Sequence, residues 1–526
     1  MPLTLSEQSL DWALEHALNY GDTDIFPEVF EFEAIKHDWQ EVRGWIRSVD
    51  ILKWNVRPYR RCLAPKHRFG FRISTQLDPL DILVFTSLIH EVGAKLESLR
   101  IPATENIVHS YRFEPKPDGR MFSDQFTYQS FQEESARICE TVEPTHVVIA
   151  DIADFFPRLY THRIDNALDS ALGVGHMHSV ALKRLLGHWA GSYSYGIPVG
   201  SAASRLIAET TIADIDQLLL SEGARYVRFS DDFRFFCKSE AEAYRFLALI
   251  ARALIENHGL TLQQSKTRIV PIDGFRRNYL REHQAREVET LSQQFYDLLE
   301  RIGIKDIYET INYNNLSDAD KALIDQLNLR QLLSDQLSEE EPDLSLLKFL
   351  LRRMSQLEDT GAVDLIANNI GRLAPVVREA IGFFVKLTTL SDTTKEDVGR
   401  RLLDVYLNEE APISHIEYGR MFLLRPFALQ SGWDSSNGLV RLYNEAVDEF
   451  SRRELLLAMG HVKMDFWFRT RKQSLLEMTP WIRRAFIRAA SCLPVDEYRH
   501  WIRGIQGQLD HTERAIAKWS SAHPIT

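Results

Sequence analysis

Three aspartates stand at the ends of β-prone segments that lie far apart in the chain. Asp151 closes the apolar run 147–150, and Asp231 and Asp232 lie between two further β-prone runs. An apolar run that ends in a carboxylate is typical of a buried strand that carries an acid to the edge of its sheet. Three carboxylates at one edge repel one another unless divalent cations lie among them. Two Mg²⁺ ions about 3.5–4 Å apart would neutralise the acids and stabilise the attacking and leaving oxygens of a phosphoryl displacement.

The adjacent acids also have a purely structural interpretation. Neighbouring carboxylates favour turns, so Ser230, Asp231 and Asp232 would equally serve as the polar tip of a hairpin. The two interpretations differ in whether Asp151 meets that tip. If it does, the arrangement is that of a polymerase palm.

The elements that must position these acids fill the first half of the chain. Up to about residue 280, short β-rich runs alternate with helical stretches such as 240–258, which is an α+β or α/β pattern. Beyond it, apolar residues recur at helical spacing between short polar breaks, and strands nearly vanish. We therefore predict an α+β domain over 1–280 and an all-α domain over 281–526. The second is expected to be a HEAT-like helical-repeat array, although it shows no strict sequence period.

Composition limits the classes of protein. The 526 residues, 44% of them hydrophobic, are enough for two or three domains with a real core. A net charge of −12 argues against a protein that coats duplex DNA through its overall field. The four cysteines are widely spaced, the amino terminus lacks a signal-peptide pattern, and no apolar segment is long enough to span a membrane. A soluble protein of a reducing, cytoplasmic compartment is expected.

Positive charge is concentrated in two runs. Residues 53–72 contain seven bases and no acid, which indicates either a solvated face or a site for phosphates. Residues 463–488 combine bases with aromatic residues, a composition that suits a single nucleic-acid strand. An ordinary amphipathic helix explains that second run better, because Ile482, Ala485, Phe486 and Ala489 follow helical spacing.

Four segments resemble motifs A to D of reverse transcriptases, in the family order. They are 151–156 for motif A, 195–204 for the loop and helix of motif B, 229–232 for motif C and 260–267 for motif D. Motif C is usually written Tyr-x-Asp-Asp, and here Phe229 replaces the tyrosine. Each match alone is weak, whereas the ordered set is strong.

The resemblance extends to the bacterial abortive-infection (Abi) reverse transcriptases, in particular the type carried by prophages. It rests on residues 20–27, on 110–113, on the Phe-Ser-Asp-Asp form of motif C and on the long helical tail. Membership would imply an antiphage DNA polymerase that adds dNTPs without a template, starting on a hydroxyl of the protein itself. It would also imply a homo-oligomer in the bacterial cytoplasm and a single-stranded DNA product attached covalently to the chain. No spacing singles out the priming residue.

The resemblance assigns roles to individual residues. Asp151, Asp231 and Asp232 would be the catalytic metal ligands, and backbone groups near Ile152 would help to hold the metal or the triphosphate. Phe156 would lie beneath the sugar and exclude a ribose 2′-hydroxyl. The alternative is that Phe155 and Phe156 both belong to the core, as at least one of them must because alternate strand residues face opposite sides.

Four more residues would contact the nucleotide. Gly200 would let the backbone approach it closely, or else serve only a turn. Arg72 and Lys66, chosen from the first basic run, would bind the triphosphate. Lys266 would donate a proton to the departing pyrophosphate, or else be merely solvated.

One departure from the family pattern concerns the template. Reverse transcriptases that copy RNA commonly have a glutamine before the motif B glycine, and here that position is Val199. An apolar side chain cannot make the hydrogen bonds that position a templated nucleotide, which fits template-independent synthesis. Two alternatives stay open: a template-directed enzyme of the retron or intron kind, and a non-catalytic helical scaffold with a degenerate palm.

Overall fold

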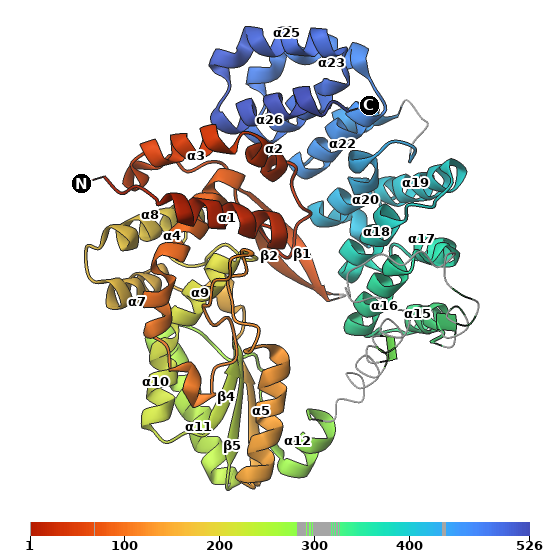
Figure 1. Ribbon diagram of the computed structural model, residues 1–526. Coiled ribbons are helices and arrows are strands. Elements are labelled where there is room, and N and C mark those ends of the chain that lie inside the picture. Colours follow the sequence, from red (N-terminus) through yellow and green to blue (C-terminus); the bar gives the residue numbers. More distant parts are fainter. Residues whose placement is uncertain are drawn as a thin grey trace. The chain divides into compact units, whose positions relative to one another are not determined.

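The computed structural model describes residues 2–67, 69–280, 327–433 and 438–525, with scattered positions between 291 and 325. The chain forms two compact units (Figure 1). The first comprises Met1–Arg61 and Ser74–Glu282, and the second comprises Cys62–Ile73 and His283–Thr526. Arg68 of the first basic run and residues 281–290, where the predicted helical domain begins, lie outside the described residues.

A four-stranded antiparallel sheet organises the first unit. Its strands are β3 (His146–Asp151), β4 (Tyr226–Phe229), β5 (Asp232–Cys237) and β6 (Arg268–Pro271), in the order β4-β5-β3-β6. The predicted hairpin is therefore present, and β5 pairs with the strand that ends in Asp151. Since β3 lies between two partners, its apolar run has neighbours on both sides.

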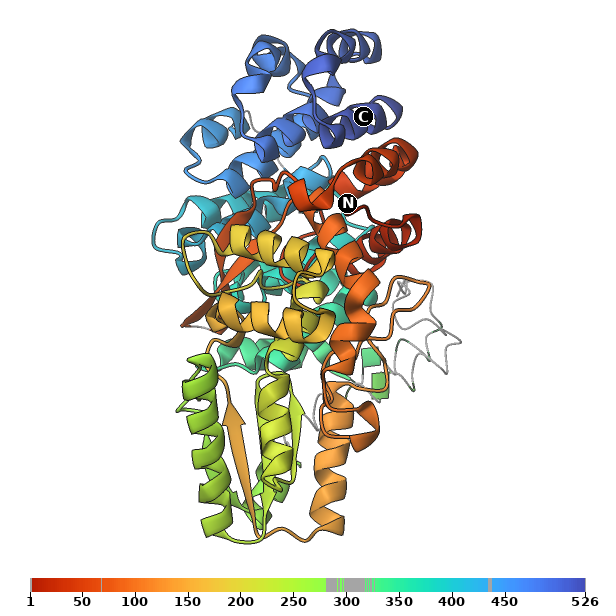
Figure 2. The same cartoon turned by 90° about the vertical axis from the view of Figure 1, so that its left-hand side faces the viewer.

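Helices cover both faces of this sheet (Figure 2). Successive strand residues point to opposite faces. On one face, Phe236 of β5 packs against Phe275 of α12 (Ile272–Asn278), in a core shared with α5 (Tyr128–Thr141). On the other face, the neighbouring Phe235 stacks on Phe246 of α11 (Glu240–Ala253).

The first unit also contains α4, a mostly buried helix that spans Pro79–Ser98, and further helices, several of which pack on it. They are α1 (Glu7–Tyr20), α2 (Glu31–His37), α3 (Trp39–Ser48), α6 (Phe155–Arg158), α7 (Thr161–Leu172), α8 (Met177–Ala190), α9 (Ala202–Thr211) and α10 (Ala213–Ser221). α9 follows the predicted motif B loop, and the Ser201 side chain caps its amino terminus.

A two-stranded hairpin carries the first basic run. Its strands are β1 (Arg60–His67) and β2 (Gly70–Gln76). The segment between Cys62 and Ile73 groups with the helical second unit, although its flanking residues belong to the first.

The second unit is built from helices after the hairpin, and its described residues from 327 onward contain no strand. The helices are α15 (Leu329–Ser338), α16 (Leu344–Gln356), α17 (Val363–Asn368), α18 (Val377–Lys386), α19 (Asp392–Leu407), α20 (Glu417–Leu429), α21 (Leu439–Glu445), α22 (Glu449–His461), α23 (Asp465–Arg471), α24 (Pro480–Ala489), α25 (Val495–Ile505) and α26 (His511–Ala522). The predicted change from α+β to helical structure is thus confirmed for the described part of the chain.

Alternate helices of this unit stack in a row from α16 through α18, α20, α22 and α24 to α26. The stacking buries one face of each helix against the next, as helical arrays do. In α24 the buried face includes Ile482, Ala485, Phe486 and Ala489, which confirms the amphipathic interpretation of the second basic run. The HEAT-like assignment itself stays a prediction. Among the described residues, no helix is both long and apolar enough to cross a membrane.

Candidate active site

Strand pairing brings the predicted carboxylates together. Asp151 is the last residue of β3 and lies directly opposite Asp232, the first residue of β5. Residues opposite each other in an antiparallel pair project to the same face of the sheet, so the two carboxylates are neighbours. Asp231 precedes Asp232 at the hairpin turn. Asp151 is buried, and the other two side chains are half-buried. Asp151 therefore meets the hairpin tip.

Hydrogen bonds from outside the hairpin hold the turn. Ser230 adopts a left-handed backbone conformation with φ of 56°, and its N–H donates to Ser110 Oγ at 2.9 Å. Asp231 accepts at its carbonyl from the N–H of Ile152 at 3.0 Å. The Ile152 N–H is thus used within the protein and its side chain is buried, so the predicted backbone role near Ile152 would fall to other main-chain atoms.

Lys266 reaches this group of acids from the motif D segment. The backbone after Asp151 pairs with residues 261–263, since Gln263 N–H donates to the Asp151 carbonyl at 2.7 Å. The following turn carries Lys266 back to the sheet, where its Nζ lies 2.6 Å from Asp151 Oδ2. Burial alone would lower the pKa of the Lys266 ammonium, but the hydrogen bond and the three aspartate charges outweigh it and raise that pKa. Lys266 is a member of the site rather than a merely solvated side chain.

The carboxylates perturb one another. Burial raises the pKa of Asp232 to about 7, and the negative charges of Asp231 and Asp151 add to the effect. Within the described ranges, no group of three or more His, Cys, Asp and Glu side chains is arranged as a metal site. The Lys266 ammonium instead supplies positive charge at Asp151.

A buried ionic network lies behind motif C, and sequence reasoning missed it. Arg228 of β4 pairs with Asp216 at 2.5 Å and Glu209 at 2.9 Å, and it donates to the Ser230 carbonyl at 2.9 Å. Glu209 also pairs with the buried Arg100 and accepts from Ser110 Oγ at 2.6 Å. The sequence did contain a signal for this network, because Arg228 is a charged residue within an apolar strand. A charged side chain that is buried requires a buried partner.

Motifs A and B lie side by side. The Ile197 N–H donates a hydrogen bond to the carbonyl of Phe156 in α6 at 3.3 Å. Tyr160 and Tyr195 pair through an isolated antiparallel β-bridge. Phe155 is buried and belongs to the core, whereas the neighbouring Phe156 is half-buried, and its role at the sugar stays a prediction. The structure therefore places Phe156 beside the loop that precedes Gly200.

Gly200 meets the amino-terminal loop. Its φ is 120°, and a Cβ built there would lie 2.2 Å from Thr23 Oγ1. Both facts require glycine at this position. The close approach that this structure shows is to Thr23, and contact between Gly200 and a nucleotide stays a prediction.

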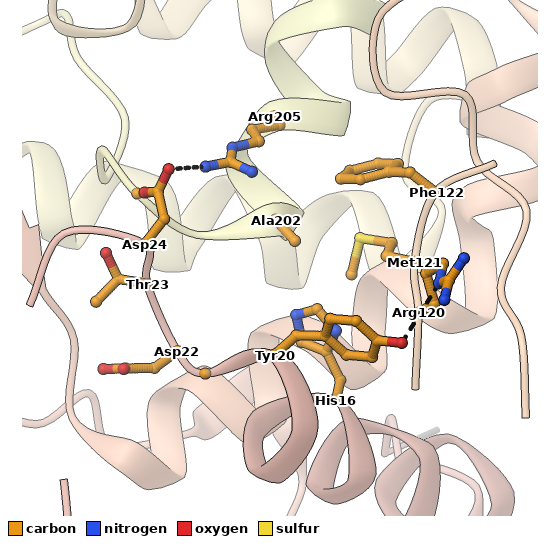
Figure 3. A pocket seen from close by; sticks show the side chains of 12 residues that line it. His16, Tyr20, Asp22, Thr23, Asp24, Arg120, Met121, Phe122, Ala202 and Arg205 are labelled. Carbon is orange, nitrogen blue, oxygen red and sulfur yellow. Dashed lines mark hydrogen bonds and ion pairs between the residues drawn. The ribbon is translucent and has the colours of Figure 1, made fainter. Parts of the chain in front are cut away.

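A cavity of about 200 Å³ opens beside Gly200 (Figure 3). It lies between α1, the loop 21–24, the segment 120–122 and α9. Figure 3 shows the rings of Tyr20 and Phe122 on different sides and Arg205 paired with Asp24. Arg205 lies over the ring of Tyr111, 5.2 Å from its centroid. Tyr111 in turn packs on Phe229 of motif C, so the cavity wall is in contact with the residues that hold the turn.

The cavity also contains a perturbed acid. Burial raises the pKa of Asp22 to about 7, against the hydrogen bond from Gln76 that favours ionisation. Because the folded chain holds the neutral form, this residue's contribution to stability is complete below the unfolded pKa near 3.8 and is lost as the pH rises through 7.

We therefore expect Asp22→Asn to gain about 2–3 kcal/mol in free energy of unfolding relative to the wild type between pH 5 and pH 8. Denaturant unfolding at the two pH values measures the change. Asp154→Asn, at an exposed position, serves as the control and should follow the wild type. If the free energy of unfolding changes equally with pH in Asp22→Asn and in the wild type, Asp22 ionises normally.

The predicted triphosphate ligands belong to the second unit. Lys66 and Arg72 lie at exposed positions of β1 and β2, in the segment that groups with the helices. Neither is among the residues that surround Asp151 within the first unit. Their role stays a prediction.

Comparison with known proteins agrees with the motifs. Residues 103–295 match the family described as reverse transcriptase (RNA-dependent DNA polymerase). No curated protein matches the chain. Among solved structures, the chain is similar to telomerase from Candida albicans in complex with a fragment of telomeric RNA, with a TM-score of 0.32 and 11% identity over 78% of this chain and 71% of that one. The matched segment contains Asp151, Gly200, Asp231, Asp232 and Lys266, and it is a reverse-transcriptase-like domain.

Proposed function

We propose that this protein is a DNA polymerase of the Abi kind, which adds dNTPs without a template onto a hydroxyl of its own chain and acts in antiphage defence. The observation that carries the proposal is the meeting of Asp151 with Asp231 and Asp232 at one sheet edge, next to Lys266. The helical region, Val199 and the Phe-Ser-Asp-Asp form of motif C support the Abi type over other reverse transcriptases. The expected assembly is a homo-oligomer in the bacterial cytoplasm, with single-stranded DNA attached to the protein.

The donor chemistry of the carboxylates suits Mg²⁺, although the described side chains are not arranged as a metal site. Their oxygens are the hard donors that this ion prefers, and a bound cation would offset the burial and the aspartate charges that raise the pKa of Asp232. Asp151, Asp231 and Asp232 would hold two ions, which when bound would stabilise negative charge on the attacking and leaving oxygens. The lysine pairing at Asp151 would then have to loosen, because both cations compete for the same oxygens.

The proposed reaction is transfer of a nucleotide from a dNTP to a hydroxyl group. The hydroxyl oxygen attacks the α-phosphorus and releases its proton to solvent water, a new P–O bond forms, and the bond to the pyrophosphate oxygen breaks. Lys266 lies where it could protonate the leaving pyrophosphate, because its ammonium is already among the carboxylates.

We expect Lys266→Gln to lower the rate of nucleotidyl transfer by about 10²-fold, the effect typical of a lost general acid. The loss should fall on the single-turnover rate rather than on dNTP affinity. Lys238→Gln, which changes an exposed lysine between β5 and α11, is the charge-matched control. A rate equal to that of the control would leave Lys266 only a structural partner of Asp151.

The proposal is tested with purified protein, radiolabelled dNTPs and Mg²⁺, with no nucleic acid added. We expect label that stays on the protein band in denaturing gels, and a nucleotide-bearing peptide after proteolysis and mass spectrometry. That peptide would also identify the priming residue. Protein that remains unlabelled under these conditions would contradict the proposal.

A template-directed enzyme is the second candidate, because the matched family is described as RNA-dependent. It predicts synthesis only when template RNA is present, with a product whose sequence follows that template. Adding a defined RNA to the same assay separates the two candidates.

A further inference from the structure

A second cavity lies at the carboxyl-terminal end of the second unit, between α25 and α26, the last two helices in Figure 1. Its volume is about 560 Å³. Four basic side chains line it, and one acid, Asp496, opposes them. The bases are Arg499, Arg503, Arg514 and Lys518. The cavity is therefore locally positive in a chain whose net charge is −12.

Helix geometry makes these bases converge. Arg499 and Arg503 are four residues apart on α25, and Arg514 and Lys518 are four residues apart on α26. Residues at that spacing share one face of a helix. Each helix thus presents two cations to the same cavity.

The three arginines that line this cavity have no acidic partner in the described part of the chain. Arg499 donates to the Ser521 carbonyl at 3.3 Å, and Arg503 donates to the Arg499 carbonyl at the same distance. Arg514 Nε is buried and has no hydrogen-bond acceptor among the described residues. A buried donor without an acceptor costs about 1–3 kcal/mol unless a ligand satisfies it.

Other arginines of the same unit behave differently. Arg469 pairs with Glu497 at 2.9 Å, and Arg483 pairs with Glu513 at 2.5 Å. Acids are thus present on α25 and α26 themselves, yet these two pair with arginines outside the cavity. This contrast indicates that the cavity arginines face an external anion.

We propose that the cavity between α25 and α26 binds the phosphate groups of a single nucleic-acid strand. Guanidinium groups bind phosphate oxygens in a bidentate manner, and a concave site with low-dielectric walls concentrates the field of its charges. The rest of the lining includes Ile502, Leu509 and Ala517, and no described lining residue is aromatic. Stacking on bases is therefore absent here, and binding should be independent of base sequence. The inference concerns the second unit alone and does not rest on the proposed polymerase activity.

The test uses the full-length protein in EDTA, so that divalent ions do not contribute. Binding of a dye-labelled oligothymidylate is followed by fluorescence anisotropy at several salt concentrations. We compare the wild type, Arg499→Gln/Arg503→Gln and the control Arg400→Gln/Arg441→Gln, which removes the same charge at exposed positions elsewhere in the unit. Loss of two phosphate contacts should weaken binding about tenfold or more and reduce the slope of log K against log salt by about 1.4. The control should match the wild type.

Calorimetric titration with inorganic triphosphate forms the second arm and distinguishes a strand from a free phosphate compound. Weakened oligonucleotide binding with unchanged triphosphate binding supports the strand. Weakened triphosphate binding with unchanged oligonucleotide binding assigns the cavity to a free phosphorylated compound and overturns the strand proposal. Equal binding of both ligands by all three proteins, or no binding by the wild type, overturns the site altogether. Thermal unfolding checks that the variants are folded, and Arg503→Lys should retain the salt dependence because it keeps the charge.

Discussion

Asp151→Asn is expected to lower nucleotidyl transfer by about 10³-fold or more. The amide keeps the shape of the side chain but removes the negative charge that would hold Mg²⁺ and that now pairs with Lys266. Metal ions contribute several kcal/mol of transition-state stabilisation, and each 1.36 kcal/mol changes the rate tenfold. Asp231→Asn should have an effect of the same order. Single-turnover incorporation of labelled dNTP measures both.

Asp154→Asn is the matched control for this experiment. Asp154 lies three residues after Asp151 in the same motif, is exposed and has a φ of 48°, a left-handed conformation that asparagine tolerates well. We expect activity within about twofold of the wild type, since surface substitutions away from special features have small effects. Activity that survives in Asp151→Asn would exclude the carboxylates as the catalytic centre.

Arg228→Met is expected to destabilise the first unit by about 3–5 kcal/mol. The side chain is fully buried and pairs with Asp216 and Glu209. Its loss leaves Asp216 in the interior without its arginine and leaves Glu209 with Arg100 as its remaining arginine. The corresponding fall in Tm is roughly 6–20 °C. Because Arg228 also holds the Ser230 carbonyl, nucleotidyl transfer should decline at temperatures where the variant is still folded.

Arg225→Met supplies the comparison for the stability measurement. Arg225 lies one residue before β4 and is exposed, so the free energy of unfolding should change by less than about 0.5 kcal/mol. Calorimetric or denaturant unfolding of the two variants and the wild type measures the difference. If both variants unfold alike, the buried network would not contribute to the stability of the palm.

Local patterns were enough to predict the parts of the site that depend on neighbouring residues. The apolar run before Asp151 becomes β3, and the β-prone runs around Asp231 become a hairpin, since strand and turn preferences act over a few residues. The helix after the motif B loop also follows from its local pattern.

Contacts between distant segments could not be predicted in this way. Lys266 pairs with an acid 115 residues away, and nothing around it distinguishes it from a solvated lysine. Gly200 is required by Thr23 of the amino-terminal loop, which no spacing connects with motif B. The partners of Arg228 come from two helices, and only their packing decides which acids reach it.

The sequence by itself determined the order of strands and helices, the carboxylate at the end of β3 and the acids of the turn. Periodicity and turn preferences depend on residues that are close together in the sequence, so they can be predicted from the sequence. Only the tertiary structure decided that Asp151 lies opposite Asp232 and that Lys266 supplies a cation there. It also decided that arginines without an acidic partner among the described residues converge between α25 and α26. Charge interactions depend on distance in space and on burial, and both arise from the packing of elements rather than from their order.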